Sequence, residues 1–201
     1  MKIEREEVTE ITVDMGMPAS EIALEVEAGG EIYTGTVISM GNPHLVIFVD
    51  EMDQADLASV GPLLECLPLF PDRTNVEFVQ VLKPDEVRMR VWERGSGITQ
   101  ACGTGACATA VAGVVRGKTK RKTKVIMDGG PLTIEWDERS GKVFMTGGAV
   151  NVFEIHQSLT RGTRQNNENN NIKTKELSMA LINEHFLKLQ NNYLSPTSRK
   201  R

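Results

Sequence analysis

The sequence has few cysteines and no segment that resembles a membrane span or a secretion signal. Its 201 residues include three cysteines, an odd number without a disulfide pattern, which is typical of a reducing cytosol. No apolar run approaches the length of a membrane span. The opening residues, MKIEREE, lack the apolar stretch of a signal peptide. These absences favour a cytoplasmic protein with no membrane partner.

The cysteine spacing and the basic residues argue against two further kinds of site. Cys102 and Cys107 do not have the Cys-x-x-Cys spacing of zinc sites and no second pair follows, so we expect no metal. A disulfide between them is not expected, because a helical turn separates them. The basic cluster at 118–124 has no interleaved aromatic residues. We therefore expect a solvated loop there and no nucleic-acid partner.

The segment after Cys102 has the composition of a helix. Residues 104–115 are small and largely apolar, and the segment closes with Arg116 and Gly117. A cation near the end followed by glycine is a usual helix stop signal. We therefore predict a helix over 104–115 that begins just after Cys102.

The start of this helix would favour negative charge, because its N–H groups are unpaired and its dipole is positive there. We predict that the Cys102 thiol ionises more easily than a free thiol and that the amides of Gly103 and Thr104 bind a substrate carboxylate. Glu93 and Arg94 enter just before the turn. A raised pKa is the alternative, since Glu93 is close and the pocket can be apolar.

A purely structural role is a second alternative for these residues. A cysteine before an alanine-rich helix can be a small buried hydrophobic residue, and Glu93 with Arg94 can form a surface ion pair. The glycines that flank Cys102 have no packing explanation and favour a reactive cysteine. Cys107, inside the helix, and Cys66, between leucines, are predicted to lie in the core.

Four segments resemble the diaminopimelate epimerase family and follow the family's order. Residues 93–108, ERGSGITQACGTGACA, are similar to the signature around its second cysteine. The others are VDMGMP at 13–18, GNPHLV at 41–46 and RTNVEF at 73–78. The resemblance covers about residues 8–155. Proline racemase and related isomerases share the fold and the paired cysteines, but the 41–44 motif and Asn75 favour the diaminopimelate branch.

The resemblance implies a cofactor-independent epimerase that interconverts LL- and meso-diaminopimelate for lysine and peptidoglycan precursors. One thiolate removes the α-proton and a second thiol returns a proton from the far side. The first cysteine belongs to an N-terminal lobe with a Cys-Gly-Asn-Gly-type turn, and nothing in residues 1–101 has that form. We expect residues 1–155 to be the C-terminal lobe with its entering segment, a fragment with little activity without its partner lobe. A homodimer is also expected.

The resemblance further implies roles for individual residues. Cys102 would be one acid/base thiol, with the amides of Gly103 and Thr104 on the α-carboxylate of diaminopimelate. Glu93 would hold the α-ammonium group, and Arg94 would reach the distal carboxylate.

Three more residues complete the expected site. Asn42 and Asn75 would recognise the distal amino-acid end, each offering a donor and an acceptor. His44 would pair with Glu93 and assist the thiol. Without the resemblance, His44 would be a hydrogen-bonded histidine that caps a loop, and Asn42 a turn residue before Pro43.

The composition changes after Ile155. Acidic residues outnumber basic ones before this point, basic residues outnumber acidic ones after it, and most asparagines follow it. Residues 164–173 are polar and of low complexity. Residues 179–194 have roughly helical spacing and resemble the start of LL-diaminopimelate aminotransferase. We hypothesise that 156–201 is a disordered, non-native tail read from the DNA leading into a neighbouring gene, which sequencing the locus would test.

The apolar pattern predicts one α+β lobe. β-Branched and alternating apolar residues predict strands at 31–40, 45–50, 76–82, 87–92, 125–127, 132–136 and 143–146. Helices are expected at 54–61 and 104–115. Many strands around one nearly all-apolar helix indicate a curved, mostly antiparallel sheet wrapped about a central helix, as in the epimerase lobe. A non-catalytic fragment that binds substrate or a complementary lobe, and a proline or hydroxyproline racemase, are the alternative functions.

Overall fold

The computed structural model describes residues 2–4, 7–52, 56–151 and 181–182. Its helices are α1 (Leu57–Glu65) and α2 (Gly103–Val115). Its strands are β1 (Lys2–Glu4), β2 (Glu7–Asp14), β3 (Ala19–Ala28), β4 (Glu31–Ser39), β5 (Pro43–Val49), β6 (Asn75–Lys83), β7 (Glu86–Glu93), β8 (Gly97–Thr99), β9 (Lys122–Met127), β10 (Gly130–Trp136), β11 (Val143–Gly148), β12 (Val150–Asn151) and β13 (Leu181–Ile182).

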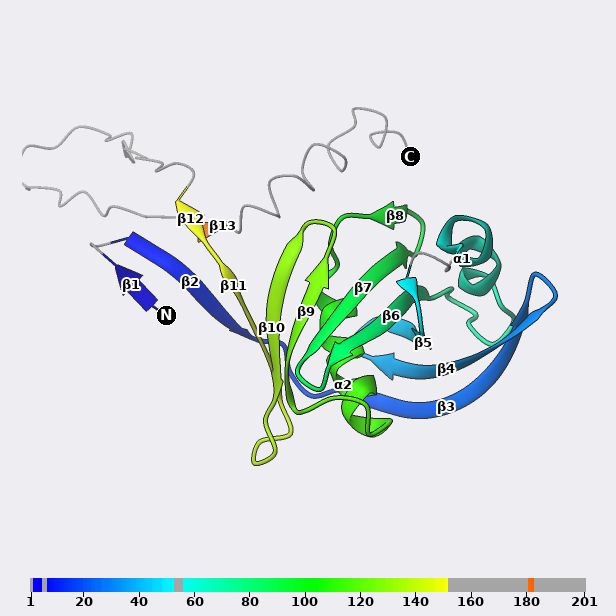
Figure 1. Cartoon of the computed structure of the whole chain (residues 1–201), viewed down its shortest axis with the longest axis horizontal. Helices are drawn as coiled ribbons and strands as arrows, with labels where there is room; N and C mark the ends of the chain where they lie inside the picture. Colours follow the sequence, from blue (N-terminus) through cyan, green and yellow to red (C-terminus); the bar gives the residue numbers. More distant parts are fainter. Residues whose placement is uncertain (1, 5–6, 53–55, 152–180, 183–201) are drawn as a thin grey trace, which may run out of the picture.

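One large sheet wraps around α2. Its strands follow the order β1-β2-β11-β10-β9-β7-β6-β5-β4-β3, with β8 beside β7. The β5–β6 and β7–β9 pairs are parallel and the other pairs in this sheet are antiparallel. Figure 1 shows the curved sheet enclosing α2, with α1 outside it beside β6 and β8. The predicted α+β lobe, a mostly antiparallel sheet around a central helix, is confirmed.

Side-chain alternation in the central strands divides the apolar residues between two cores. In β5, Val46 packs in the core around α2, whereas Leu45 and Ile47 pack in the core beneath α1. In β6, Val79 joins the α2 core and Phe78 the α1 core. Burying one such side chain stabilises a fold by roughly 1.5–3 kcal/mol. Both faces of these strands are therefore covered, which explains the continuous apolar run at 45–49 in β5.

The helix α2 begins and ends where the sequence predicts. Cys102 is its N-cap residue. Every residue from Gly105 to Gly113 is buried, as expected for a helix that is apolar on all sides. At the other end, Gly117 adopts a positive φ of 66° and its N–H binds the carbonyl of Val114 at 3.0 Å. Glycine suits this left-handed position because it has no Cβ.

The helix α1 lies further along the chain than the predicted span of 54–61. It begins at Leu57, with Asp56 as its N-cap, and continues through Pro62 to Glu65. The Gly-Pro pair, which resembles a stop signal, lies inside the helix. Gly61 is needed for packing, since a Cβ there would lie 2.7 Å from ring atoms of Trp92. The close approach of helix and sheet explains the glycine better than a helix end does.

The seven predicted strands are confirmed as β4 to β7 and β9 to β11. The sequence prediction missed the other strands, of which β2 and β3 are the longest. Glutamate and alanine recur in β3, and both are depleted in strands, so the local pattern is weak. Pairing with β4 from Ile22 to Ala28 holds this strand in place. The strand conformation of β3 is therefore set by its pairing with β4, because its own residues have little preference for a strand.

Most of the predicted tail lies outside the described residues, so its disorder and the division at residue 155 stay predictions. Leu181 and Ile182 are described, and they form β13 against β12. The roughly helical spacing of residues 179–194 therefore does not give a helix at these two positions. Within the described ranges, no helix is long and apolar enough to cross a membrane.

Candidate active site

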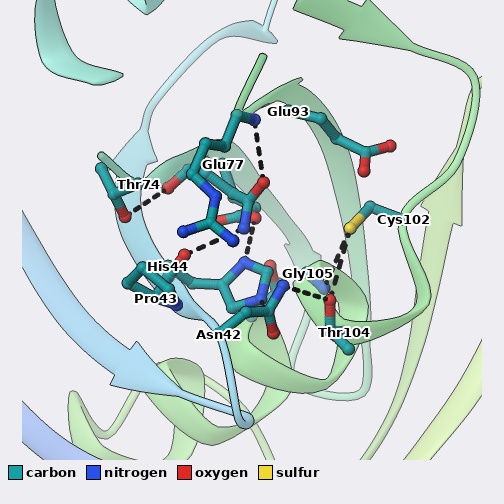
Figure 2. Close-up of polar contacts among 12 residues, drawn as sticks. Asn42, Pro43, His44, Thr74, Glu77, Glu93, Cys102, Thr104 and Gly105 are labelled. Carbon is teal, nitrogen blue, oxygen red and sulfur yellow. Dashed lines mark hydrogen bonds and ion pairs between the residues drawn. The ribbon is translucent and has the colours of Figure 1, made fainter. Parts of the chain in front are cut away.

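Three strands carry polar side chains toward the N-terminus of α2. Residues two apart on a strand share a face. The valines that face α2 are Val46 of β5, Val79 of β6 and Val91 of β7. The same alternation turns His44, Glu77 and Glu93 to this side, at the strand ends nearest the helix start (Figure 2). The apolar core thus gives way to a polar cluster at one end of α2.

Cys102 has extended backbone dihedrals, φ −138° and ψ 112°, as an N-cap residue requires. Its Sγ accepts a hydrogen bond from the Gly105 N–H at 3.4 Å, and its carbonyl accepts one from the Ala106 N–H at 2.9 Å. Gly103 and Thr104 are the first two helical residues, so their N–H groups have no carbonyl acceptor within the helix. The helix start predicted just after Cys102 is therefore present, and anion binding by these amides stays a prediction.

The acidity of Cys102 differs from the main prediction. Burial, then the charges of Glu93 and Glu77, raise the pKa of the thiol to about 12. Hydrogen bonds from Thr104 and from the Gly105 N–H act in the opposite direction but are outweighed. The expected lowering of the pKa is wrong for this chain. The helix end does favour a thiolate, yet Cys102 is only 7% exposed and two carboxylates lie close to it.

The other two cysteines have opposite environments. Cys107 is buried in the core around α2, as predicted. Cys66 is exposed, so its predicted place in the core is wrong. It follows the last residue of α1, Glu65, and caps the helix with its own N–H on the carbonyl of Leu64.

We expect Cys66 to be alkylated before Cys102 and Cys107 at about pH 8. The attacking species is the thiolate. At a pH below the pKa of a thiol, each unit by which that pKa rises lowers the thiolate fraction about tenfold. The raised pKa of Cys102 therefore suppresses its thiolate until strongly alkaline pH, and burial limits access. Peptide mapping by mass spectrometry after timed exposure to iodoacetamide measures all three sites together. Modification of Cys102 first would contradict the raised pKa.

A chain of polar contacts links β6 to the thiol. Glu77 Oε1 lies 2.6 Å from His44 Nδ1, and His44 Nε2 lies 3.1 Å from Asn42 Oδ1. Asn42 Nδ2 donates to the hydroxyl of Thr104 at 3.3 Å, and this hydroxyl lies 3.6 Å from Cys102 Sγ. Figure 2 shows Asn42 between His44 and Thr104. Asn42 and His44 thus belong to one network with the helix start.

His44 does not pair with Glu93, the partner that the resemblance implied. Its partner is Glu77, and Glu93 instead accepts a hydrogen bond from the Thr99 hydroxyl. Glu77 is a functional candidate that the sequence interpretation missed. A signal was present: a single carboxylate stands in a strand whose neighbours, Val76 and Phe78, are buried apolar residues. Such a charge is rarely buried without a partner.

Asn75 and Arg94 are joined through the backbone. The buried Asn75 amide donates to the carbonyl of Pro43 and accepts from the N–H of Arg94, both at 2.9 Å. The exposed Arg94 side chain donates to the carbonyl of Asp72 at 2.9 Å. Asn75 therefore fixes the path of the chain at Arg94, a position from which a guanidinium group can face a ligand.

Glu65 is a second residue that the sequence interpretation missed. Its carboxylate accepts hydrogen bonds from Trp92 Nε1 at 2.7 Å, from the Gly95 N–H at 3.0 Å and from Arg73 Nη1 at 3.3 Å. Burial opposes its ionisation, but these hydrogen bonds outweigh burial and hold the pKa of Glu65 below its ordinary value. Glu65 therefore anchors the turn that carries Glu93. Nothing local in its sequence indicates this role.

The arrangement is suited to proton transfer beside an anion. A thiol whose pKa is raised holds its proton firmly, and two carboxylates stand nearby. The adjacent helix start offers amide donors to a negative group. An acidic cluster, a buried thiol and unpaired helix-start amides therefore lie together at this end of α2.

The fold is similar to that of two solved structures. A hydroxyproline epimerase from Agrobacterium vitis gives a TM-score of 0.51 at 16% identity, covering 73% of this chain and 51% of that one. A probable proline racemase from Agrobacterium radiobacter K84 gives a TM-score of 0.51 at 15% identity, covering 73% and 52%. At these identities the likeness shows the fold alone. The fold class is that of these racemases and epimerases.

The sequence comparisons identify the branch. The family model for diaminopimelate epimerase matches residues 36–152. A diaminopimelate epimerase of Parabacteroides distasonis is 96% identical over 155 residues, which are 77% of this chain and 58% of that relative. One from Bacteroides thetaiotaomicron is 56% identical over 155 residues, 77% of this chain and 57% of the relative. The chain belongs to the diaminopimelate epimerase family, and it spans less than two thirds of the length of these relatives.

Proposed function

We propose that this chain supplies one acid/base thiol, Cys102, to a diaminopimelate epimerase. The observation that carries the proposal is the position of this thiol: it caps the helix start in a chain whose sequence is 96% identical to a named diaminopimelate epimerase over the matched residues. The substrate is then a small molecule with two amino-acid ends, and no cofactor takes part. A cytoplasmic location and a homodimer remain predictions.

The proposed reaction inverts one α-carbon of diaminopimelate. A thiolate on one face removes the α-proton, leaving an electron pair that is delocalised into the carboxylate. A thiol on the other face donates its proton to the same carbon, so one proton leaves and another arrives. Cys102 enters as the thiol, because its raised pKa favours the protonated form. The amides of Gly103 and Thr104 would stabilise the negative charge that develops on the carboxylate.

The second thiol is proposed to come from a complementary lobe. Cys107 lies in the core and Cys66 at the end of α1, so neither accompanies Cys102 at the helix start. Two groups must face the α-carbon from opposite sides for inversion. The present chain offers one of these faces.

Substrate recognition is proposed for the groups around the thiol. Glu93 would hold the α-ammonium group, since its carboxylate is near enough to Cys102 to raise the pKa of the thiol. Arg94 would bind the distal carboxylate. Asn42 and Asn75 would add hydrogen bonds, although the structure already uses part of each amide within the chain.

Exchange of the α-proton tests the proposal. The chain is incubated in deuterated water with LL-diaminopimelate, with and without the N-terminal lobe of the Parabacteroides distasonis relative, and label is followed by mass spectrometry. We expect little epimerisation by the chain alone and conversion to the meso form when the lobe is added. L-Proline and hydroxyproline serve as matched alternative substrates.

Three other outcomes of the exchange experiment would contradict the proposal. Full turnover by the chain alone would contradict the need for a second lobe. Faster labelling of proline or hydroxyproline would favour the racemase alternative. Binding of diaminopimelate without any exchange, even with the lobe present, would favour the non-catalytic fragment.

A further inference from the structure

Glu77 is a fully buried carboxylate in the candidate site, and the proposed reaction gives this carboxylate no direct role. Its side chain and that of His44 are both 0% exposed. Oε1 contacts His44, whereas Oε2 is buried without a hydrogen-bond partner among the described residues. An unsatisfied buried oxygen is unfavourable for stability. Because Glu77 is present despite this destabilising oxygen, it is a candidate for a role in the chemistry of the site.

The Glu77 carboxylate lies against the same glycine as the thiol. A Cβ at Gly105 would be 2.7 Å from Glu77 Oε1 and 3.2 Å from Cys102 Sγ. Both groups therefore pack on one side of Gly105, and only the missing side chain leaves room for them. This contact is independent of the hydrogen bonds that run through His44.

The donors and acceptors in this network can be assigned from His44 to Cys102. Asn42 Nδ2 donates to the Thr104 hydroxyl, so Asn42 Oδ1 is the atom that faces His44, and Nε2 of His44 donates to it. On the other side of the ring, His44 Nδ1 lies 2.6 Å from Glu77 Oε1. Because the Thr104 hydroxyl accepts from Asn42, its own hydrogen can point to Cys102 Sγ. In this orientation the sulfur accepts from both the Thr104 hydroxyl and the Gly105 N–H.

We propose that Glu77 is a positioning residue that acts on Cys102 through His44, Asn42 and Thr104. Glu77 fixes the histidine ring, the ring fixes the amide, and the amide turns the hydroxyl hydrogen toward the sulfur. The importance of this role for catalysis rests on the proposed function of Cys102. The effect of Glu77 on the Cys102 thiol does not depend on that proposed function.

The test measures the pH dependence of Cys102 alkylation in the full chain, with Cys66 as an internal reference on the same peptide map. The titratable groups around the thiol are Glu93 from β7, Glu77 from β6 and His44 from β5. Glu77→Gln removes a charge near the sulfur and also loosens the network. Because the nearby charge opposes the thiolate more than the Thr104 hydrogen bond favours it, we expect the alkylation midpoint to fall by roughly one pH unit.

A double-mutant cycle separates action through the network from action through space. Asn42→Ala cuts the network between His44 and Thr104, and we expect it to raise the midpoint. In that background Glu77→Gln removes only the charge, so the fall in midpoint should be larger than in the parent. An equal fall in both backgrounds, or no fall in either, would overturn the proposal.

Two further variants serve as controls, one for the loss of a charge elsewhere and one for a failure of Glu77→Gln to fold. Glu86→Gln removes one charge from a half-buried position at the end of β7 opposite Glu93, and it should leave the Cys102 midpoint unchanged. If Glu77→Gln shows no cooperative thermal transition, Glu77→Asp replaces it: the charge stays, but the shorter side chain cannot reach His44. We then expect a raised midpoint and no added effect of Asn42→Ala, and additive effects would overturn the proposal.

These measurements need no substrate, so the two proposals can fail separately. Loss of the non-additive effect would refute the role of Glu77 while epimerisation persists. Absence of epimerisation with the effect intact would refute the proposed function alone.

Discussion

Replacing Cys102 with alanine is expected to abolish conversion of LL- to meso-diaminopimelate while leaving binding nearly unchanged. The thiol is the only acid/base group that this chain is proposed to place on its face of the α-carbon, and such groups contribute about 10²–10⁴-fold to rates. The helix-start amides of Gly103 and Thr104 remain, so the carboxylate keeps its donors. The chain combined with the complementary lobe is assayed by chiral chromatography for inversion and by calorimetry for affinity.

The matched control is Cys66→Ser, an exposed cysteine at the end of α1. It should leave both inversion and affinity at the parent level. Inversion that survives in Cys102→Ala would remove Cys102 from the chemistry. A large loss of affinity in Cys102→Ala would instead indicate that the thiol mainly shapes the binding site.

Replacing Arg94 with alanine is expected to have the largest effect on substrate affinity. A guanidinium group can bind a carboxylate through two parallel hydrogen bonds, which a neutral residue cannot imitate. Loss of one partner of a desolvated charge pair costs about 2–5 kcal/mol. Asn75→Ala should cost less, about 0.5–1.5 kcal/mol, as expected for neutral hydrogen bonds. Calorimetry with diaminopimelate measures both variants with the lobe present.

Arg116→Ala provides the matched control for Arg94. This arginine is the C-cap of α2, at the end of the helix far from Cys102, and its loss should leave affinity unchanged. If Arg94→Ala binds diaminopimelate as tightly as the parent, Arg94 does not hold the distal carboxylate. If proline proves the better ligand of the parent, the assignment to the diaminopimelate branch fails.

Local signals were sufficient for most of the fold. The apolar run after Cys102 and the glycine after Arg116 predict α2 within one residue at its start and at its correct end. The seven strands with strong β-branched patterns also appear as predicted. By contrast, β3 is defined by its partner β4, and the span of α1 depends on Gly61 packing against Trp92. Those two cases required contacts between distant residues.

The partner of His44 shows the same limit within the site. Positions 44 and 77 are far apart in the sequence, and either Glu77 or Glu93 is chemically able to bind an imidazole. The parallel register of β5 and β6, in which His44 lies opposite Asn75, brings Glu77 to the same face and within 2.6 Å. A motif can indicate which residue types take part, but only strand register decides which of them meet.

The sequence alone determined that a cysteine caps an apolar helix, that the chain builds a curved sheet around that helix, and which family the motifs resemble. These properties follow from composition, periodicity and end signals, which act over a few neighbouring residues. Only the tertiary structure decided the acidity of the thiol and its network. Helix polarity favours a thiolate at Cys102, but burial and the carboxylates of Glu93 and Glu77 raise its pKa. Desolvation and charge proximity depend on three-dimensional distance, so no local pattern around Cys102 could determine their balance.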